Sequence, residues 1–280
     1  MAGRSQTRKK GHIKIPGVGL CHPKLKSRKS KTCLTNDQLS KIKESVNASD
    51  EAGRASLEAR LGCRPGDEVC LLRKSGLSET EKKNIEKSAF RPKMPSDWNG
   101  DLSTWLSDDD IRIVMKQYEE AYPEFKFLEV VPIDFSAQDP YSKTEKKCIV
   151  ETFCKVNFKE LKAEGKTKIG AVFNLDPSYK GGSHWVALFI NITKKEVNYF
   201  DSYGIKPPEQ IARFMRNLTL QDKKLKLQFN SRRFQFKDSE CGMYSMIFIL
   251  SMLIGINFKY FCRHPISDAE AQKFRGFLYR

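Results

Sequence analysis

Apolar positions in residues 100–280 fall into short strand-like runs and longer runs with helical spacing. Short apolar or alternating runs bounded by turn residues predict strands, and apolar residues that recur every three or four positions predict helices. Strand character is found at 127–131, 170–175, 184–190, 196–201 and 225–229. Helical character is found from 108 for roughly 14 residues, and at 208–217, 241–254 and 267–279. These elements predict an α+β domain with a central mixed sheet flanked by helices.

The preceding residues, 35–99, carry weaker and shorter patterns. Helical spacing is present at 35–46 and 55–61, and 82–88 is mostly polar and charged. The segment 91–100 contains two prolines and a glycine without an apolar period, which is typical of a connector. We therefore expect a small helical accessory region with its connector at 35–99, and a main domain at 100–280.

The N-terminal residues of the chain are strongly basic. The formal net charge is +16, and residues 1–34 contain ten basic residues and no acidic residue. The basic residues are Arg4, Arg8, Lys9, Lys10, Lys14, Lys24, Lys26, Arg28, Lys29 and Lys31. This composition predicts a disordered basic arm that makes non-specific contact with nucleic acid. A solubilising or localising tail without a specific partner is the alternative, and composition does not separate the two.

The eight cysteines occur without an apolar leader segment at the N-terminus. We expect a reducing compartment in which the thiols are mostly free. The spacings of Cys63 to Cys70 and of Cys148 to Cys154 do not fit a zinc knuckle, so we expect no metal. The longest apolar run, 243–258, is shorter than the roughly 20 residues of a membrane span and predicts a buried helix.

Two residues at strand ends suggest a base and its orienting carboxylate. His184 opens a predicted strand after Gly181, Gly182 and Ser183, and Asp201 ends the next strand. If the two strands form a hairpin, the carboxylate returns to the end of the sheet where the imidazole lies. A carboxylate in that position holds the ring and stabilises its cation. A lone histidine is usually structural, so the inference depends on the residues that follow.

Cys241 precedes Gly242 and a long apolar helix, which places its sulfur at a helix N-terminus. The helix dipole there favours a thiolate, the nucleophilic form of cysteine. Gly242 lets the backbone turn closely behind the sulfur and leaves amides free to face an oxyanion. Gln235 lies six positions earlier, in the loop that leads to Cys241, where its amide can donate to the same oxyanion. The four residue types in the order His, Asp, Gln, Cys indicate a catalytic site more specifically than any one of them does alone.

This set resembles the adenovirus-protease and SUMO-specific-protease clan of cysteine peptidases. The matching residues are 183–186 (SHWV), 199–202 (YFDS), Gln235 and 240–242 (ECG), and 105–111 (WLSDDDI) is similar to the clan's substrate-groove motif. The chain looks most similar to the polyprotein-processing proteases of large cytoplasmic DNA viruses such as African swine fever virus, on 61–63 with Cys70 and on 273–280. Glu240 stands where many clan members have Asp, and Met243 also departs from the pattern.

The resemblance implies a cysteine endopeptidase with nucleophile Cys241, base His184, orienting residue Asp201 and oxyanion donor Gln235. It implies substrate contacts from Trp185, Trp105 and Asp108, and neither a metal nor an organic cofactor. The implied substrate is a viral structural polyprotein cut after Gly-Gly sites, and the implied location is the host cytoplasm, at the viral factory, and the virion. A deubiquitinating or deSUMOylating isopeptidase that acts on host conjugates is the alternative. A nucleic-acid-binding protein with a degenerate protease domain is disfavoured, because all four catalytic residues are present.

Overall fold

The computed structural model describes residues 19–25, 32–49, 53–98, 100–138 and 148–280. A five-stranded sheet runs through the larger part, with the strands in the order β1-β2-β3-β4-β5. The strands are β1 (Phe125–Pro132), β2 (Lys168–Asn174), β3 (Trp185–Asn191), β4 (Glu196–Phe200) and β5 (Lys226–Phe229). The outer pairs are parallel and the inner pairs β2–β3 and β3–β4 are antiparallel. The predicted mixed sheet is therefore confirmed.

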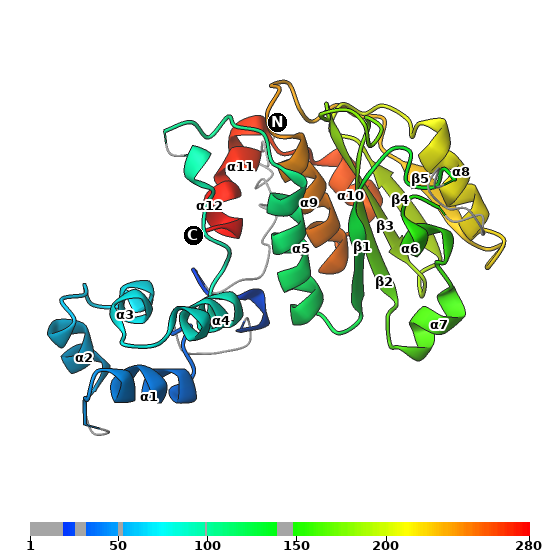
Figure 1. The fold of residues 1–280 in the computed structure, drawn as a ribbon. Coiled ribbons are helices and arrows are strands. Elements are labelled where there is room, and N and C mark those ends of the chain that lie inside the picture. The colour runs from blue at the N-terminus through cyan, green and yellow to red at the C-terminus, as the bar shows by residue number, and fades with distance from the viewer. Residues whose placement is uncertain (1–18, 26–31, 50–52, 99, 139–147) are drawn as a thin grey trace, which may run out of the picture.

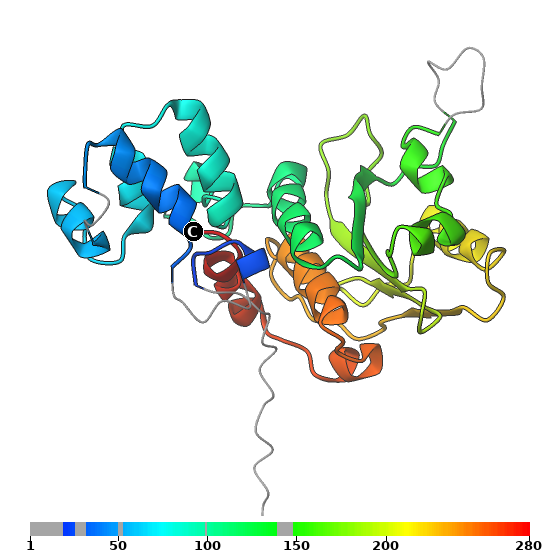
Figure 2. The same ribbon diagram turned by 90° about the horizontal axis from the view of Figure 1, so that it is seen from below.

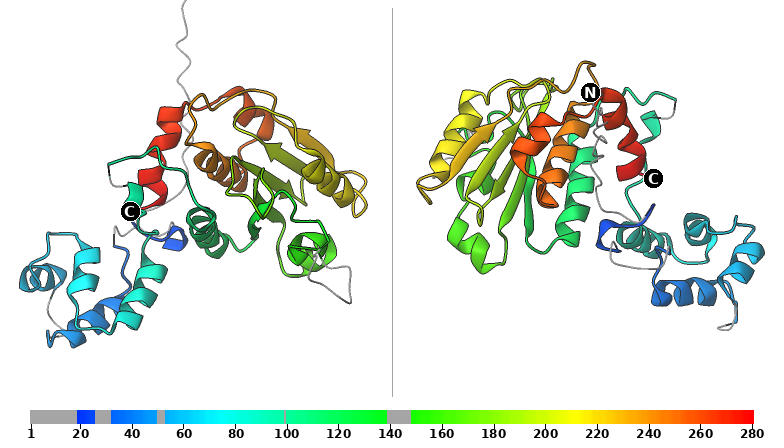
Figure 3. Two further views of the ribbon diagram at one scale, coloured as in Figure 1. Left: turned by 45° about the horizontal axis from the view of Figure 1, so that its top comes forward. Right: turned by 180° about the vertical axis from the view of Figure 1, so that it is seen from behind.

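Helices cover both faces of this sheet (Figures 1 and 3). One face packs against α5 (Asp108–Ala121) and α9 (Cys241–Leu253), and the same core continues into the helices nearer the C-terminus. The other face packs against α6 (Glu151–Cys154), α7 (Phe158–Ala163) and α8 (Glu209–Leu218). Because both faces are covered, every residue of β3 is buried, which explains its continuous apolar run.

The helix α9 has no polar face. All of its residues are buried, so it forms the centre of the core rather than a surface helix. Its first residue is Cys241, which the core therefore holds in a fixed position relative to the sheet. Among the described residues, no helix is long and apolar enough to cross a membrane.

The chain's last segment differs from its prediction. The predicted capping box of Ser267 with Glu270 is confirmed, but the single predicted helix is divided at Phe274 into α11 (Asp268–Lys273) and α12 (Arg275–Leu278), after α10 (Phe258–Arg263). The backbone of Arg280 then pairs with the connector, since its N–H donates to Pro92 O and its carbonyl accepts from Met94 N. This pairing requires the extended chain end that a longer helix would not provide.

The accessory region is a separate cluster of short helices next to α5 (Figure 2). It contains α1 (Asn36–Ser45), α2 (Arg54–Arg60), α3 (Glu68–Lys74) and α4 (Glu79–Ala89), with η1 (Pro23–Leu25) before them and η2 (Ser96–Trp98) in the connector. Its core is small and apolar and has its own members. Helix α3 was not predicted, because its short apolar run lacks a repeated period.

Part of the predicted basic arm belongs to this core. The predicted disorder of residues 1–18 and 26–31 falls outside the described residues, whereas residues 19–25 and 32–34 are described. Within them Cys21, Leu25, Cys33 and Leu34 are buried in the accessory core, so the disorder predicted from charge does not hold there.

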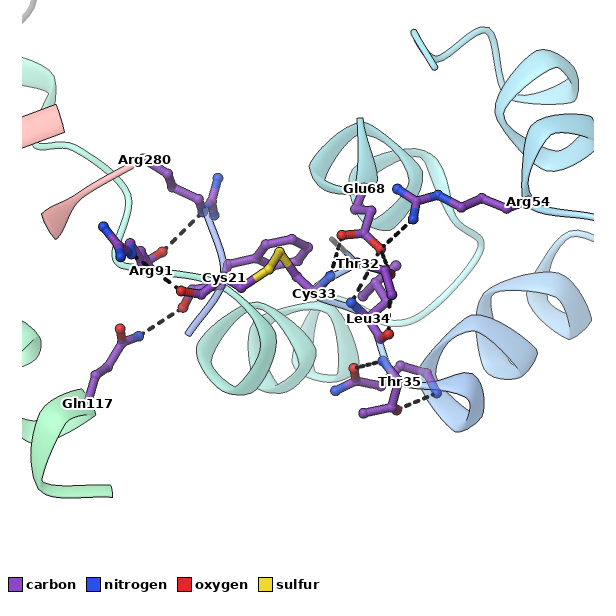
Figure 4. Close-up of a disulfide and its surroundings, with 12 residues drawn as sticks. Cys21, Thr32, Cys33, Leu34, Thr35, Arg54, Glu68, Arg91, Gln117 and Arg280 are labelled. Carbon is purple, nitrogen blue, oxygen red and sulfur yellow. Dashed lines mark hydrogen bonds and ion pairs between the residues drawn. A yellow bond between two sulfur atoms is a disulfide. The ribbon is translucent and has the colours of Figure 1, made fainter. Parts of the chain in front are cut away.

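The expectation of mostly free thiols is wrong. Disulfides join Cys21 to Cys33, Cys63 to Cys70 and Cys148 to Cys154, and the free cysteines are Cys241 and Cys262. Figure 4 shows the first bridge between two hydrogen-bonded segments: the carbonyl of Cys21 accepts from Arg91, and the N–H of Cys33 donates to the Glu68 carboxylate. A small region with a limited core gains stability from such cross-links. Chain spacing alone did not reveal the pairing, because it depends on where the helices pack.

Candidate active site

His184 and Asp201 meet at one end of the sheet. His184 directly precedes β3 and Asp201 directly follows β4, and the antiparallel register of the two strands brings them together. The imidazole Nε2 lies 2.8 Å from Asp201 Oδ1. The predicted return of the carboxylate to the histidine is confirmed. Both side chains are shielded from solvent, which strengthens a charged hydrogen bond.

Backbone and side-chain donors hold Asp201 in place. The N–H of Tyr203 donates to Asp201 Oδ1 over 2.8 Å, so this oxygen is bound twice. Asn230, just after β5, accepts from Asp201 N over 2.9 Å and donates to Asp201 O over 2.7 Å. The side chain of Asn230 thus fixes the backbone at the strand end. The sequence did not reveal this role, because the two residues are 29 positions apart.

Cys241 is the first residue of α9 and a free, buried thiol. It interacts with the imidazole of His184, whose Nε2 is bound to Asp201. The residue before it, Glu240, is the N-cap but makes no side-chain capping bond, so no cap side chain occupies the first-turn amides. A thiol, an imidazole and a carboxylate therefore form one chain of contacts at a helix N-terminus.

The groups around His184 favour the protonated form of its imidazole. Burial lowers the pKa of His184, but hydrogen bonds to Asp201 and Cys241, together with their negative charges, outweigh it and raise the pKa to about 9. A protonated imidazole in this position can act as a general acid.

The residues packed around Gly242 leave no space for a side chain at this position. A Cβ on this residue would come within 2.7 Å of Leu106 Cδ1 and 3.2 Å of Trp185 Cδ1. Leu106 is itself tied to Trp185, because the indole Nε1–H donates to Leu106 O over 2.9 Å. The glycine lets the segment before α5 lie directly on the start of α9, next to the sulfur.

Gln235 is fully buried in the loop before α9. Its Oε1 accepts from the Ser202 hydroxyl over 2.7 Å, and its Nε2 donates to Lys237 O over 2.6 Å. The described hydrogen bonds of this side chain do not include His184 or Cys241. One of the two Nε2 hydrogens is bound by Lys237, which leaves the second for another acceptor.

A groove of about 550 Å³ has His184 in its lining. Residues from three segments, 105–108, 130–132 and 174–185, line it, including the predicted contacts Trp105, Asp108 and Trp185. Trp105 is 46% exposed, whereas Trp185 is buried beneath the groove. Asp108 is the first residue of α5 and is paired with Arg112 over 3.1 Å. The structure therefore brings these three residues and His184 to one groove.

A buried ion pair beside the nucleophile position was not predicted. Arg275 and Glu240 are 0% and 2% exposed, and the guanidinium lies 3.3 Å from the carboxylate. Arg275 also donates to Thr104 O over 2.8 Å and stacks on Trp98. The C-terminal segment thus holds the side chain of Glu240, the residue before Cys241, through an ion pair. The only signal in the sequence was the similarity of 273–280 to viral proteases.

The chain is similar to viral cysteine proteases. A thiol protease of Acanthamoeba polyphaga mimivirus is 30% identical over 302 residues, which cover 94% of this chain and 94% of that protein. The SUMO-1 cysteine protease of African swine fever virus is 34% identical over 118 residues, or 40% of this chain and 43% of that protein. A crystal structure of an African swine fever virus protease superposes with a TM-score of 0.69 at 21% identity, over 95% of this chain and 97% of the other, which supports the fold.

The fold and these relatives identify the protein as a cysteine protease. Residues 166–280 match the C-terminal catalytic domain of the Ulp1 protease family. The chain belongs to this family. The resemblance inferred from the sequence is confirmed, and the mimivirus and African swine fever virus relatives are encoded by viruses.

Proposed function

We propose that Cys241 is the nucleophile, His184 the acid and base, Asp201 the orienting carboxylate and Gln235 an oxyanion donor. The observation that carries this assignment is the set of interactions of His184 with Asp201 and with Cys241, beside a groove that His184 lines. A nucleophile and base in contact, with a third group that orients the base, is the geometry that covalent catalysis requires.

In the first half-reaction the Cys241 thiolate attacks the scissile carbonyl carbon. A C–S bond forms and the carbonyl oxygen becomes an oxyanion, which accepts from the Cys241 backbone N–H and from the Gln235 amide. As the tetrahedral intermediate collapses, the C–N bond breaks and His184 gives its proton to the leaving amine. The products are a thioester on Cys241 and a free amine.

In the second half-reaction water attacks the thioester. Neutral His184 takes a proton from the water as its oxygen bonds to the carbonyl carbon, and the same donors hold the oxyanion. The C–S bond then breaks, which releases the carboxylic acid and restores the thiolate with the imidazolium. Asp201 keeps one ring orientation throughout, so both proton transfers use the same nitrogen.

The proposed substrate is a structural polyprotein of a virus, cleaved after Gly-Gly. Trp185 and Leu106 pack on Gly242 directly beside the sulfur, so little space remains there for a substrate side chain. A site with so little space favours substrates that have residues without side chains at the cleavage site. The competing function is an isopeptidase for ubiquitin-like conjugates, and its support is the African swine fever virus relative, which is named a SUMO-1 cysteine protease.

The proposed location is the viral factory in the host cytoplasm and then the virion. Three disulfides favour the virion as the site of the mature form, because disulfides persist in oxidising surroundings such as virion surfaces. The basic N-terminal residues are proposed to add non-specific contact with nucleic acid. Truncation of residues 1–18, which leaves the accessory core intact, tests this contact by the salt dependence of DNA binding.

Capture by electrophilic probes tests the proposed function. A Gly-Gly peptide, ubiquitin and SUMO, each with a C-terminal electrophile, are incubated with the full chain and with Cys241→Ala. We expect the peptide probe to form an adduct on Cys241 alone. Capture of SUMO or ubiquitin in preference to the peptide would favour the isopeptidase, and labelling that persists in Cys241→Ala would overturn the assignment.

A further inference from the structure

Tyr203 lies against the catalytic imidazole, and the mechanism above does not use its side chain. Its ring centre is 4.6 Å from that of His184, and the two planes differ by 15°. The phenol ring therefore covers one face of the imidazole. The two residues lie at the same end of the sheet, since His184 precedes β3 and Tyr203 follows the antiparallel strand β4.

Arg233 holds this ring from the neighbouring loop. Its guanidinium carbon lies over the Tyr203 ring at 5.1 Å and over the Phe236 ring at 5.0 Å. Its Nε donates to Gln235 O over 2.6 Å. One side chain thus contacts both the residue that stacks on the base and the backbone of the proposed oxyanion donor.

The backbone beneath the stack is packed too closely to move independently. A Cβ on Gly204, whose φ is +75°, would come within 2.7 Å of the Arg232 carbonyl carbon. Phe234 N and Gln235 N both donate to Ser202 O. The turn after Asp201 and the loop before Cys241 therefore form one unit.

We propose that Tyr203 is a positioning residue for His184, and that Arg233 braces it against the Gln235 loop. This inference rests on the proposed function, because it assigns a role around the same base. The stacked ring stops the imidazole from tilting out of line between sulfur and leaving group, and it keeps water from the face of the His184–Asp201 hydrogen bond. A π-face against an imidazolium also stabilises its positive charge.

The ring, rather than the hydroxyl, carries this role. The groups with charge around the stack are Asp201, Cys241, Asp238 and Arg233. Within the described residues, the hydrogen bonds of these groups do not include the Tyr203 hydroxyl, whereas the ring contacts His184 directly. The conservative variant Tyr203→Phe should therefore retain the effect, and Tyr203→Ala should lose it.

The test compares Tyr203→Ala and Tyr203→Phe with the parent in two measurements. In Tyr203→Ala we expect kcat to fall by on the order of tenfold to a hundredfold with little change in KM, because misplacement of the base affects the chemical step. We expect the pKa of His184, followed by NMR and assigned with His184→Asn, to fall by about one pH unit. Tyr203→Phe should stay within about twofold of the parent in kcat and keep the parental pKa.

Phe236→Ala is the matched control, because Phe236 contacts the same guanidinium but is 71% exposed and does not stack on His184. It should leave the His184 pKa at the parental value. A parental pKa and kcat in folded Tyr203→Ala would overturn the proposal, as would an equal loss in Tyr203→Phe. The NMR titration needs no turnover, so an inactive parent would refute the proposed function while still deciding the role of Tyr203.

Discussion

Arg275 and Glu240 form a buried ion pair that joins the last helix to the residue directly before Cys241. Burial raises the pKa of Glu240, and the charge and hydrogen bonds of Arg275 oppose this rise. The pair explains why a glutamate is accommodated at this position: the longer side chain reaches a guanidinium that also holds the carbonyl of Thr104 and stacks on Trp98. The start of α9, the segment before α5 and the C-terminus are thereby one packed unit.

Removal of one partner of this pair should be costly. Arg275→Met leaves the Glu240 carboxylate buried without its cation, and we expect a loss of about 3–5 kcal/mol in the free energy of unfolding. Denaturant unfolding measures the loss. The double variant Arg275→Met/Glu240→Gln serves as the control and should recover part of it, because no buried charge is left unpaired. A change below about 1 kcal/mol in the single variant would show that the pair is not structural.

The strands and the long helices could be predicted because their patterns are local. The buried runs of β2 and β3 and the amphipathic period of α5 are set by neighbouring residues, and their predicted bounds differ from the structure by at most two positions. The His184–Asp201 contact could be predicted for the same reason, since one hairpin connects the two residues.

The rest depends on contacts between distant segments. Arg275 reaches Glu240 across 35 positions, and Cys21 meets Cys33 only because the first segment pairs with Phe90. Nothing local in the sequence indicated that the ring of Tyr203 would lie on the imidazole. Residues that orient a catalytic site do so through tertiary packing, and a periodic pattern in the sequence does not identify them.

The pH dependence of stability should carry a signature of His184. Its pKa is raised from the ordinary value of 6.5 to about 9, so its protonation stabilises the folded state fully below pH 6.5, and this contribution is lost as the pH rises through about 9. The free energy of unfolding should therefore decrease across this window more in the parent than in His184→Gln. Parallel profiles for the two proteins would contradict a raised pKa at this residue.

The bridge between Cys21 and Cys33 should stabilise the accessory region. Replacement of both cysteines by serine releases a cross-link with a separation of 12 residues, and we expect a loss of about 2–4 kcal/mol. Thermal unfolding of the parent and of this variant under non-reducing conditions gives the difference. Replacement of Cys148 and Cys154 is the comparison that should leave the accessory region unaffected. Peptide mapping without reductant that finds Cys21 as a free thiol would contradict the bridge itself.

Gln235 should matter for the rate rather than for binding. If its second Nε2 hydrogen donates to the oxyanion, Gln235→Ala should lower kcat by on the order of 10²-fold to 10³-fold with a smaller effect on KM. Gln235→Glu should be at least as harmful, because a carboxylate places negative charge beside a developing anion. Steady-state kinetics on one Gly-Gly peptide decide the matter, and rates within a few-fold of the parent for both variants would remove Gln235 from the site.

The central claim is that the thiol of Cys241 performs the cleavage. The most direct test is the turnover of a Gly-Gly peptide by Cys241→Ala, with circular dichroism and unfolding measured on the same sample. Alanine is a good helix former and is smaller than cysteine, so the start of α9 should be retained. The account predicts a folded protein whose hydrolysis is at background level. Normal turnover by this variant would contradict it.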